Sequence, residues 1–408
     1  MNSKELLEMS LNLPSPWYIE DVKFHPPIGN EISGRIEIYL NFTRGYKFTD
    51  SKGNQATAHD TVERKWRHLD FFQHECTLIA RLPRLKLVGG GIETVQVPWS
   101  REGSGFTLLY EATCLLFVEN EMPVKKASKM LRLTDTRLWR IIAHWVSKAR
   151  DNDDQHDVTE LGIDETSVSK GHQYITVGVD MIKKRVIFVT KGKSSKCIEK
   201  LKDHLISKGC PPEQIKQVCI DMSPAFISGV NTNFPEAELT IDKFHVNIYM
   251  NKAMDELRKE ERRKFIELKG SKYIFLKNDK KLTKRQSFTK HHLLTSYPRL
   301  GEGYRLKELF NEFWSIKTPE EAAAYLSYWC DLAEESGIKS FVEVVKTIKN
   351  HWDGIMNYIK SKLTNGILEG INSKIQLAKK RARGYRNIDN FITMIHLTAG
   401  KLKLDYPL

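Results

Sequence analysis

Five short apolar runs between residue 158 and about residue 245 constrain the fold of this chain most strongly. The first three, ELGIDETSV, QYITVGVDM and RVIFVTKG, are separated only by short polar turns (Ser169–Gly171 and Lys183–Lys184), which is typical of an antiparallel meander. A helical stretch (SSKCIEKLKDHLISKG), a fourth run (IKQVCIDMS), a helix-like segment and a fifth run (AELTIDKFH) follow. This order predicts an α/β fold in which helices flank a mixed sheet.

The remaining regions have different patterns. Short alternating runs such as RIEIYLNF predict a β-rich N-terminal domain, and the acidic block DNDDQHD predicts a solvated linker at 151–157. Leu368, Ile371, Ile375, Ala378 and Ala382 recur at helical spacing and predict a last helix against the sheet. We therefore expect a β-rich domain (1–105), a helical domain (106–150), the first part of the sheet domain (158–243), a helical segment (244–360) and the final helices (361–408).

Charge and hydropathy limit the classes of protein to which this chain can belong. The 408 residues carry a formal net charge of +13, which favours a polyanionic partner. No run of 18 or more apolar residues and no secretory signal pattern is present, so we expect no membrane partner. The six cysteines form no CxxC pair, as in reduced thiols of a cytoplasmic protein.

Three acids stand in positions that call for an explanation. Asp164 and Asp221 each follow an apolar run, in LGIDET and VCIDMS, and side chains at strand ends face the ligand crevice of α/β sheets. Glu369 is the one acid in LTNGILEGINSKIQLAKKRARGYRN (363–387), which carries six Lys and Arg from Lys374 onward. A helix returning to the sheet could bring Glu369 beside the two aspartates.

Three clustered carboxylates repel one another unless cations lie between them. Oxygen ligands suit Mg²⁺ or Mn²⁺, and two such ions can activate a nucleophile and stabilise the leaving oxygen at a phosphodiester. Each acid alone is also compatible with a cap or a solvated group, and Asp221 before Ser-Pro fits a helix N-cap. The three together favour the metal site. The basic residues that follow Glu369 would then hold a DNA backbone: Lys379, Lys380, Arg381, Arg383 and Arg386.

The chain resembles the ISL3 family of bacterial insertion-sequence transposases, which belong to the DDE group with an RNase H-like catalytic domain. The matching stretches are VERKWRHLD (62–70), VQVPWSREGSGFT (95–107), LGIDETSVSKGHQY (161–174), IDMSPAF (220–226), IDKFHV (241–246), GILEGINSKI and RGYRN. The resemblance implies an all-helical insertion within the catalytic domain and a catalytic triad of Asp164, Asp221 and Glu369. It also implies metal-dependent cleavage and joining of DNA, with terminal inverted repeats and target DNA as partners.

Asp242 and His245 resemble the D-x-x-H signature of related transposases. His245 could contact a phosphate or steady an active-site loop. A purely structural histidine bonded to Asp242 is an equal alternative.

The segment VKKASKMLRLTDTRLWRIIAHW (124–145) has the pattern of a helix-turn-helix. A short helix with Ala127 and Met130 would lead into a turn at Leu133–Thr134, and Thr134 or Asp135 would cap the second helix. That second helix would present Thr136, Arg137 and Arg140 to a major groove. Its buried stripe would be Leu138, Ile141, Ile142 and Trp145. A plain helical hairpin is the alternative.

Residues 258–292 contain 13 Lys and Arg against four acids, with Tyr273, Phe275 and Phe288 interleaved. Arg262, Arg263 and Lys264 would contact DNA phosphates, which gives sequence-independent and salt-sensitive binding. A solvated charged face is the alternative.

The resemblance also implies a zinc-binding cysteine cluster around the WRHLD strand, and this sequence departs from it. The corresponding stretches, FTDSKGNQATAHDT and LKLVGGGIET, contain no cysteine, and Cys76 stands alone. We therefore expect a degenerate zinc-ribbon-like domain without zinc. Its core would consist of Trp66, Leu69, Phe71, Leu85, Val97 and Trp99.

An active transposase is the leading hypothesis, acting as a homodimer or higher oligomer on DNA in the bacterial cytoplasm, at the nucleoid. A catalytically silent DNA-binding regulator is the runner-up, although a regulator need not keep three mutually repelling acids. An RNase H-like nuclease without strand transfer is the third hypothesis, and the helix-turn-helix and basic segment argue against it.

Overall fold

The computed structural model describes residues 3–29, 32–169, 173–277, 282–361 and 366–405. The expected turn at Ser169–Gly171 lies largely outside these ranges. The chain forms two compact units, one of Met1–Asp151 with Lys403–Leu408 and one of Asn152–Leu402. No helix in the described ranges is long and apolar enough to span a membrane.

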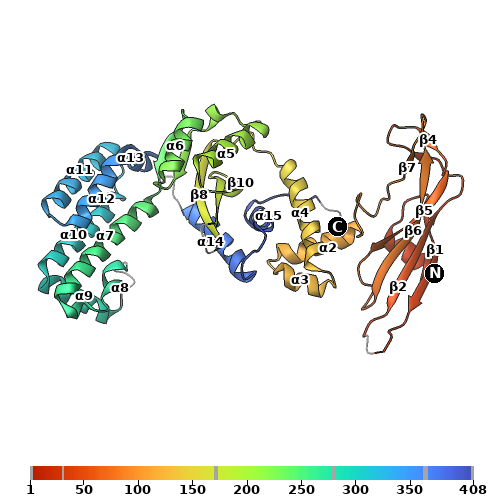
Figure 1. Ribbon diagram of the computed structural model, residues 1–408, viewed down its shortest axis with the longest axis horizontal. Helices are drawn as coiled ribbons and strands as arrows, with labels where there is room; N and C mark the ends of the chain where they lie inside the picture. The colour runs from red at the N-terminus through yellow and green to blue at the C-terminus, as the bar shows by residue number, and fades with distance from the viewer. Residues whose placement is uncertain (1–2, 30–31, 170–172, 278–281, 362–365, 406–408) are drawn as a thin grey trace. The chain divides into compact units, whose positions relative to one another are not determined.

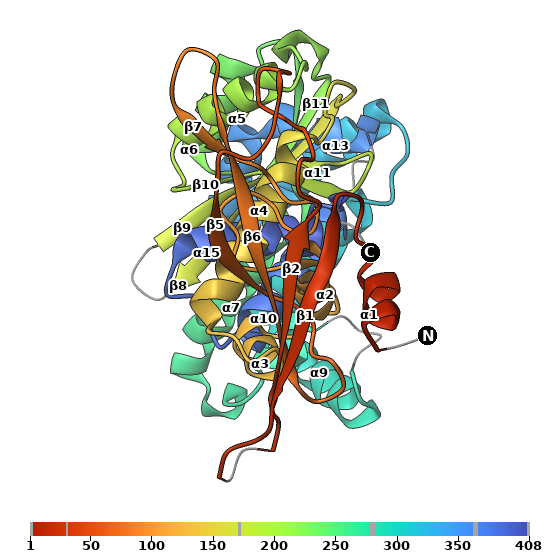
Figure 2. The same ribbon diagram turned by 90° about the vertical axis from the view of Figure 1, so that its right-hand side faces the viewer.

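The first unit is built on a five-stranded sheet with the order β1-β2-β6-β5, in which β7 also pairs with β6 (Figure 2). Strands β2 and β6 are parallel, and the other pairs are antiparallel. The elements are α1 (Ser3–Leu11), β1 (Trp17–His25), β2 (Arg35–Phe42), β3 (Phe48–Thr49), β4 (Gln55–Ala56), β5 (Asp60–Arg67), β6 (Glu75–Lys86) and β7 (Ile92–Thr94).

Aromatic rings dominate the core of this sheet. Trp99 lies edge-on to Trp17 and Trp66, with ring centroids 4.9 and 5.7 Å apart. Of the core that we expected, Trp66 and Leu85 are buried, while Val97 and Trp99 pack against the cluster. Phe71 was expected inside and is 38% exposed, because it lies in the tight turn that pairs it with His74. Leu69 is only partly buried and lies outside the cluster.

Three helices complete the first unit: α2 (Leu108–Glu119), α3 (Val124–Met130) and α4 (Asp135–Asp151). The expected stripe of Leu138, Ile141, Ile142 and Trp145 is buried. The Thr134 hydroxyl accepts a hydrogen bond from the Arg137 amide, as expected of a cap. Met130 is 56% exposed at the end of α3, whereas Ala127 is buried.

Hydrogen bonds join these helices to the sheet. Arg67 on β5 exchanges backbone hydrogen bonds with Gly105 and Thr107, just before α2. The imidazole Nδ1 of His68 lies 2.9 Å from the hydroxyl of Thr107, which also caps α2. Burial, followed by the charge of Arg67, lowers the pKa of His68 to about 4. The neutral imidazole is therefore part of the joint between sheet and helices.

The second unit contains a five-stranded sheet with the order β10-β9-β8-β11-β12. Its first three strands form the expected antiparallel meander, whereas β8, β11 and β12 are mutually parallel. The elements are β8 (Glu160–Ser169), β9 (Gln173–Asp180), β10 (Arg185–Lys191), α5 (Ser195–Ser207), a 3₁₀ turn (Pro212–Gln214), β11 (Gln217–Ile220), α6 (Pro224–Asn233) and β12 (Glu238–Ile241).

The linker at 151–157 is less solvated than its acidity predicts. Asp153 forms an ion pair with Arg185, a side chain that is only 8% exposed. Gln155 is buried, and its side-chain amide lies within hydrogen-bond distance of His204. The start of the second unit is therefore tied to β10 and α5.

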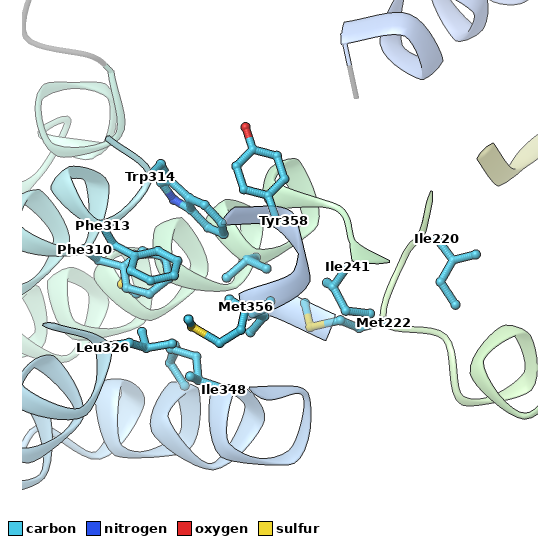
Figure 3. Close-up of a cluster of buried hydrophobic side chains, with 14 of the residues drawn as sticks. Ile220, Met222, Ile241, Phe310, Phe313, Trp314, Leu326, Ile348, Met356 and Tyr358 are labelled. Carbon is cyan, nitrogen blue, oxygen red and sulfur yellow. The ribbon is translucent and has the colours of Figure 1, made fainter. Parts of the chain in front are cut away.

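The helical region after β12 begins with α7 (Lys243–Lys264) and ends with α13. Its apolar core is continuous with that of the sheet: Ile241 and Met222 lie near Met356, and Phe310 and Trp314 lie further along the same cluster (Figure 3). The other elements are a 3₁₀ turn (Ile266–Leu268), α8 (Lys272–Leu276), α9 (Lys284–Ser296), α10 (Pro298–Phe313), α11 (Pro319–Glu335), α12 (Lys339–Asn350) and α13 (Trp352–Ser361).

The last two helices pack on the part of the sheet that β8, β9 and β10 form. Leu368, Ile371 and Ile375 on α14 (Gly366–Arg381) pack with residues of β8, β9 and β10, as the apolar spacing predicted. Helix α15 (Ile388–Ala399) joins the same cluster through Phe391 and Ile395.

We predict that the buried His68 makes stability depend on pH. Its pKa is about 4 in the folded chain and near 6.5 when unfolded, so protonation favours the unfolded state. The contribution of the neutral His68 side chain to the free energy of unfolding is complete above pH 6.5 and is lost as the pH falls towards 4. Asn keeps a polar partner for Thr107 without titrating. His68→Asn should therefore flatten the fall of the thermal midpoint between pH 7 and about 4.5.

The control is His59→Asn, which changes an exposed histidine of the same unit. Its pH profile should follow that of the unmodified protein. Parallel profiles for His68→Asn and the unmodified protein would contradict a buried neutral imidazole at this joint.

Candidate active site

The register of the parallel strands aligns three aspartates. Gln217 on β11 pairs with Glu160 on β8 and with Glu238 on β12. Continuing these offsets places Asp221 level with Asp164 on one side and with Asp242 on the other. The amide of Asp242 donates to the carbonyl of Ile220, which holds this alignment where β11 ends. Three acids thus lie in a row across adjacent strands.

Asp164 does not end its strand, in contrast to Asp221. Strand β8 continues to Ser169 beside β9, and Asp164 pairs with Val177. Its other neighbour, β11, stops at Ile220, so the β11 ladder ends before it reaches Asp164.

The carboxyl group of Asp164 is held from two sides. One oxygen accepts a 2.7 Å hydrogen bond from the Glu165 amide, and the other accepts one from the Asn372 side chain. Burial raises the pKa of Asp164 to about 6, against these hydrogen bonds and the nearby His245, and the charge of Asp221 adds to the rise. A cation at this position would favour the ionised form.

Helix α14 crosses the sheet at this point because Gly162 leaves room for it. A Cβ atom on Gly162 would lie 2.8 Å from the Leu368 side chain. One turn further on, the side-chain oxygen of Asn372 accepts a 3.0 Å hydrogen bond from the Thr166 hydroxyl. The side-chain NH₂ group of Asn372 donates to Asp164. These contacts fix the helix against β8.

Glu369 lies on α14 between these two contact points. It precedes Asn372 by three residues, so both side chains project from neighbouring positions of the helix surface. Glu369 is exposed. Within the described ranges, no three His, Cys, Asp or Glu side chains converge closely enough to hold a metal ion. The structure brings Asp164 and Asp221 close to each other. Glu369 lies about one helical turn from Asn372 and does not join them in a metal-binding group.

Asp242 and His245 form a pair at the start of α7. One Asp242 oxygen caps the helix by accepting from the Phe244 amide at 2.6 Å, and the other lies 2.9 Å from Nδ1 of His245. Burial lowers the pKa of His245, but the hydrogen bond and charge of Asp242, with Asp164 and Asp221, raise it overall. The structural role that we considered is present, and the imidazole is also near enough to Asp164 and Asp221 for their charges to raise its pKa.

The basic residues after Glu369 have different surroundings. The Lys379 ammonium donates to the carbonyl of Ser167 at 2.7 Å, so it helps to fasten α14 to β8. Lys380, Arg381, Arg383 and Arg386 are exposed.

In the first unit, Thr136, Arg137 and Arg140 are exposed on α4. The Arg137 guanidinium lies 4.4 Å from the centroid of the Phe106 ring, within the range of a cation–π contact.

In the basic segment 258–292, Arg262 and Arg263 are exposed at the end of α7. Lys264 is exposed too, but its ammonium lies 3.2 Å from Glu261. Arg258 is buried in an ion pair with Asp255, and Phe275 is fully buried. Part of this segment therefore serves the helical core.

Comparison with known proteins identifies the family. A family model of DDE transposases of the ISL3 type, described as "Transposase", matches residues 161–395, more than half of the chain. The chain belongs to the ISL3 family of transposases. Two further models match: the helix-turn-helix domain of transposase family ISL3 at residues 95–146, and the zinc-finger of transposase IS204/IS1001/IS1096/IS1165 at residues 53–86.

Curated relatives agree over nearly the whole length. The chain is 28% identical to the transposase for insertion sequence element IS1557 of Mycobacterium tuberculosis, covering 98% of this chain and 96% of that protein. It is 26% identical to the transposase for insertion sequence element IS1001 of Bordetella parapertussis, covering 88% and 90%. The protein is a DDE-group DNA transposase, and a silent regulator is not favoured.

Asn372 and Thr166 are the site residues that the sequence did not indicate. Their side chains are hydrogen-bonded although the two residues are 206 positions apart in the sequence, so no local sequence pattern predicts the contact. The one available signal was the helical offset of three residues between Glu369 and Asn372 in LEGIN.

We predict that Asn372 holds α14 in place. Asn372→Ala removes the donor to Asp164 and leaves the buried Thr166 hydroxyl without this acceptor. Two such losses should lower the free energy of unfolding by about 1–3 kcal/mol, measured by denaturant titration. Ser373→Ala, an exposed neighbour, is the control and should change little. Equal stability of the two variants would contradict this role.

Proposed function

We propose that this transposase cleaves DNA at the ends of its insertion sequence and joins it to target DNA through Asp164, Asp221 and Glu369. In this proposal the second unit is an RNase H-like catalytic domain interrupted by an all-helical insertion at 244–360. The strand register supports it most directly, because it sets Asp164 level with Asp221. Asn372 fastens the helix that carries Glu369 to Asp164 itself.

The residues fit a divalent metal. The donors are carboxylate oxygens, which Mg²⁺ and Mn²⁺ prefer, and a cation would stabilise the ionised form of the partly buried Asp164 carboxyl group. Asp164, Asp221 and Glu369 would hold two ions. Bound there, the ions would supply charge stabilisation at the attacking and leaving oxygens of the phosphodiester.

The chain's own groups would then position the DNA. Glu369 would move inward by a side-chain rotation, since Asn372 already holds the helix against β8. The imidazolium of His245, supported by Asp242, would face a phosphate oxygen near the acids. Lys380, Arg381, Arg383 and Arg386 would contact the backbone beyond Glu369, while Lys379 supports α14.

Recognition and delivery of the DNA would involve other regions. Arg137 and Arg140 would contact bases at the terminal inverted repeats, and Arg262, Arg263 and Lys264 would contact phosphates. We infer a homodimer or higher oligomer on DNA, because two element ends must be processed together. We also infer action in the bacterial cytoplasm, at the nucleoid.

The test of this function is Glu369→Gln, which keeps the side-chain shape and removes the charge. The exposed position predicts an intact fold and intact DNA binding. Strand cleavage should fall by several orders of magnitude, because the variant lacks a metal ligand. Mg²⁺ or Mn²⁺ should raise the thermal midpoint of the unmodified protein more than that of the variant.

The matched control is Glu335→Gln, which neutralises an exposed acid at the end of α11. It should cleave DNA normally. A Glu369→Gln protein that cleaves at a rate comparable with this control would overturn the proposed triad.

We also infer that the N-terminal domain folds without zinc, although residues 53–86 match a zinc-finger family. The one thiol in this stretch, Cys76, is 1% exposed, and burial raises its pKa to about 11, whereas zinc binds thiolates. Asp50 organises the β3–β4 turn instead, by accepting from the amides of Lys52 and Asn54. The aromatic core supplies the remaining stability.

We predict that elemental analysis of the purified chain will show no stoichiometric zinc. A chelator should leave its thermal midpoint unchanged, because apolar burial rather than metal ligation holds the domain. One zinc per chain, whose removal unfolds the first unit, would contradict this.

A further inference from the structure

The most basic segment of the chain also carries two strongly exposed aromatic rings. Phe288 on α9 is 78% exposed and Tyr273 on α8 is 62% exposed, whereas Phe275 between them is fully buried. Removing a large apolar side chain from water is favourable. Two strongly exposed rings within one charged segment are therefore suited to contact a partner.

Both rings point away from the interior of the helical region. Tyr273 lies two positions before the buried Phe275, on the opposite side of α8. Phe288 lies opposite the buried Lys290 and Leu293 on α9. Helices α8 and α9 pack against each other (Figure 1), and each of them carries one exposed ring.

Polar and basic side chains flank the rings. Lys284 and Arg285 lie one turn before Phe288, and the imidazole side chains of His291 and His292 lie one turn after it, all exposed. The Lys272 ammonium lies 5.7 Å from the centroid of the Tyr273 ring. This chemistry suits a partner with both flat apolar faces and negative charge.

The start of α9 supports an anionic partner independently. Thr283 and Gln286 form a capping box that fixes this helix end. Its first turn contains no acid, and Lys284 and Arg285 lie where the helix dipole disfavours positive charge. Phosphate groups near this turn would compensate for that repulsion.

We propose that Phe288, together with Tyr273, stacks on unpaired bases of the DNA substrate while the surrounding Lys and Arg side chains hold its phosphates. In a duplex, neighbouring base pairs cover the faces of the bases, so an aromatic ring stacks readily only on unpaired ones. A second copy of this chain is a poorer occupant, because it would bring a net charge of +13 to an already basic region. The proposal rests on the proposed contact between the helical insertion and DNA.

The experiment compares two probes of equal length, a blunt duplex and a duplex with a short thymine overhang. Affinity is measured by fluorescence anisotropy over a range of salt concentrations. Phe288→Leu should weaken binding of the overhang probe about tenfold, as expected when one base stack is removed, with an unchanged salt slope. Binding of the blunt probe should change little. Phe288→Tyr keeps a ring and should retain the affinity for the overhang.

Two controls separate this proposal from the function on which it rests. Tyr328→Leu removes a ring that is 57% exposed on the acid-rich α11 and should have no effect on either probe. Arg262→Ala combined with Arg263→Ala should lower the salt slope on both probes, by about 0.9 for each DNA phosphate that is no longer neutralised.

If the arginine variant lowers the slope and Phe288→Leu binds the overhang normally, stacking is wrong and the insertion still contacts DNA. If the slope is unchanged while Phe288→Leu loses affinity for the overhang, stacking stands and the proposed phosphate contacts are wrong. A Phe288→Leu variant that changes the oligomeric state without changing affinity would also overturn the proposal.

Discussion

The parallel pairing of β11 between β8 and β12 is the constraint on which the site depends. Its register, continued past the paired residues, places Asp164, Asp221 and Asp242 at one level, and β11 ends at Ile220 just before it. A shift by one residue would turn these side chains to the other face of the sheet. The apolar residues that alternate with the acids prevent such a shift, because Ile163 and Ile220 are buried in the core.

Helix α14 connects that register to the rest of the chain. It approaches β8 closely over Gly162. The side chain of Asn372 then donates a hydrogen bond to Asp164 and accepts one from Thr166. The long helical region between β12 and α14 must therefore bring the chain back to β8 in a defined position. Its core, which is continuous with Ile241 and Met222 at the end of the sheet, provides the required rigidity.

The sequence allowed the strands, the α4 stripe and the α14 stripe to be predicted, because each follows a local apolar period. The predictions failed where tertiary contacts decide. Phe71 is apolar but lies in a tight turn. Asp153 pairs with Arg185 across 32 positions. Asn372 was visible only as a polar neighbour of Glu369, since its partners lie more than 200 residues away.

The central claim is that Asp164, Asp221 and Glu369 share divalent metal ions although they come from distant parts of the chain. Anomalous diffraction from crystals of the transposase soaked in Mn²⁺ tests it most directly. We predict a manganese peak within coordination distance, about 2.0–2.2 Å, of carboxylate oxygens from all three residues. A peak bound by Asp164 and Asp221 with Asp242 in place of Glu369, or no peak at this end of the sheet, would contradict it.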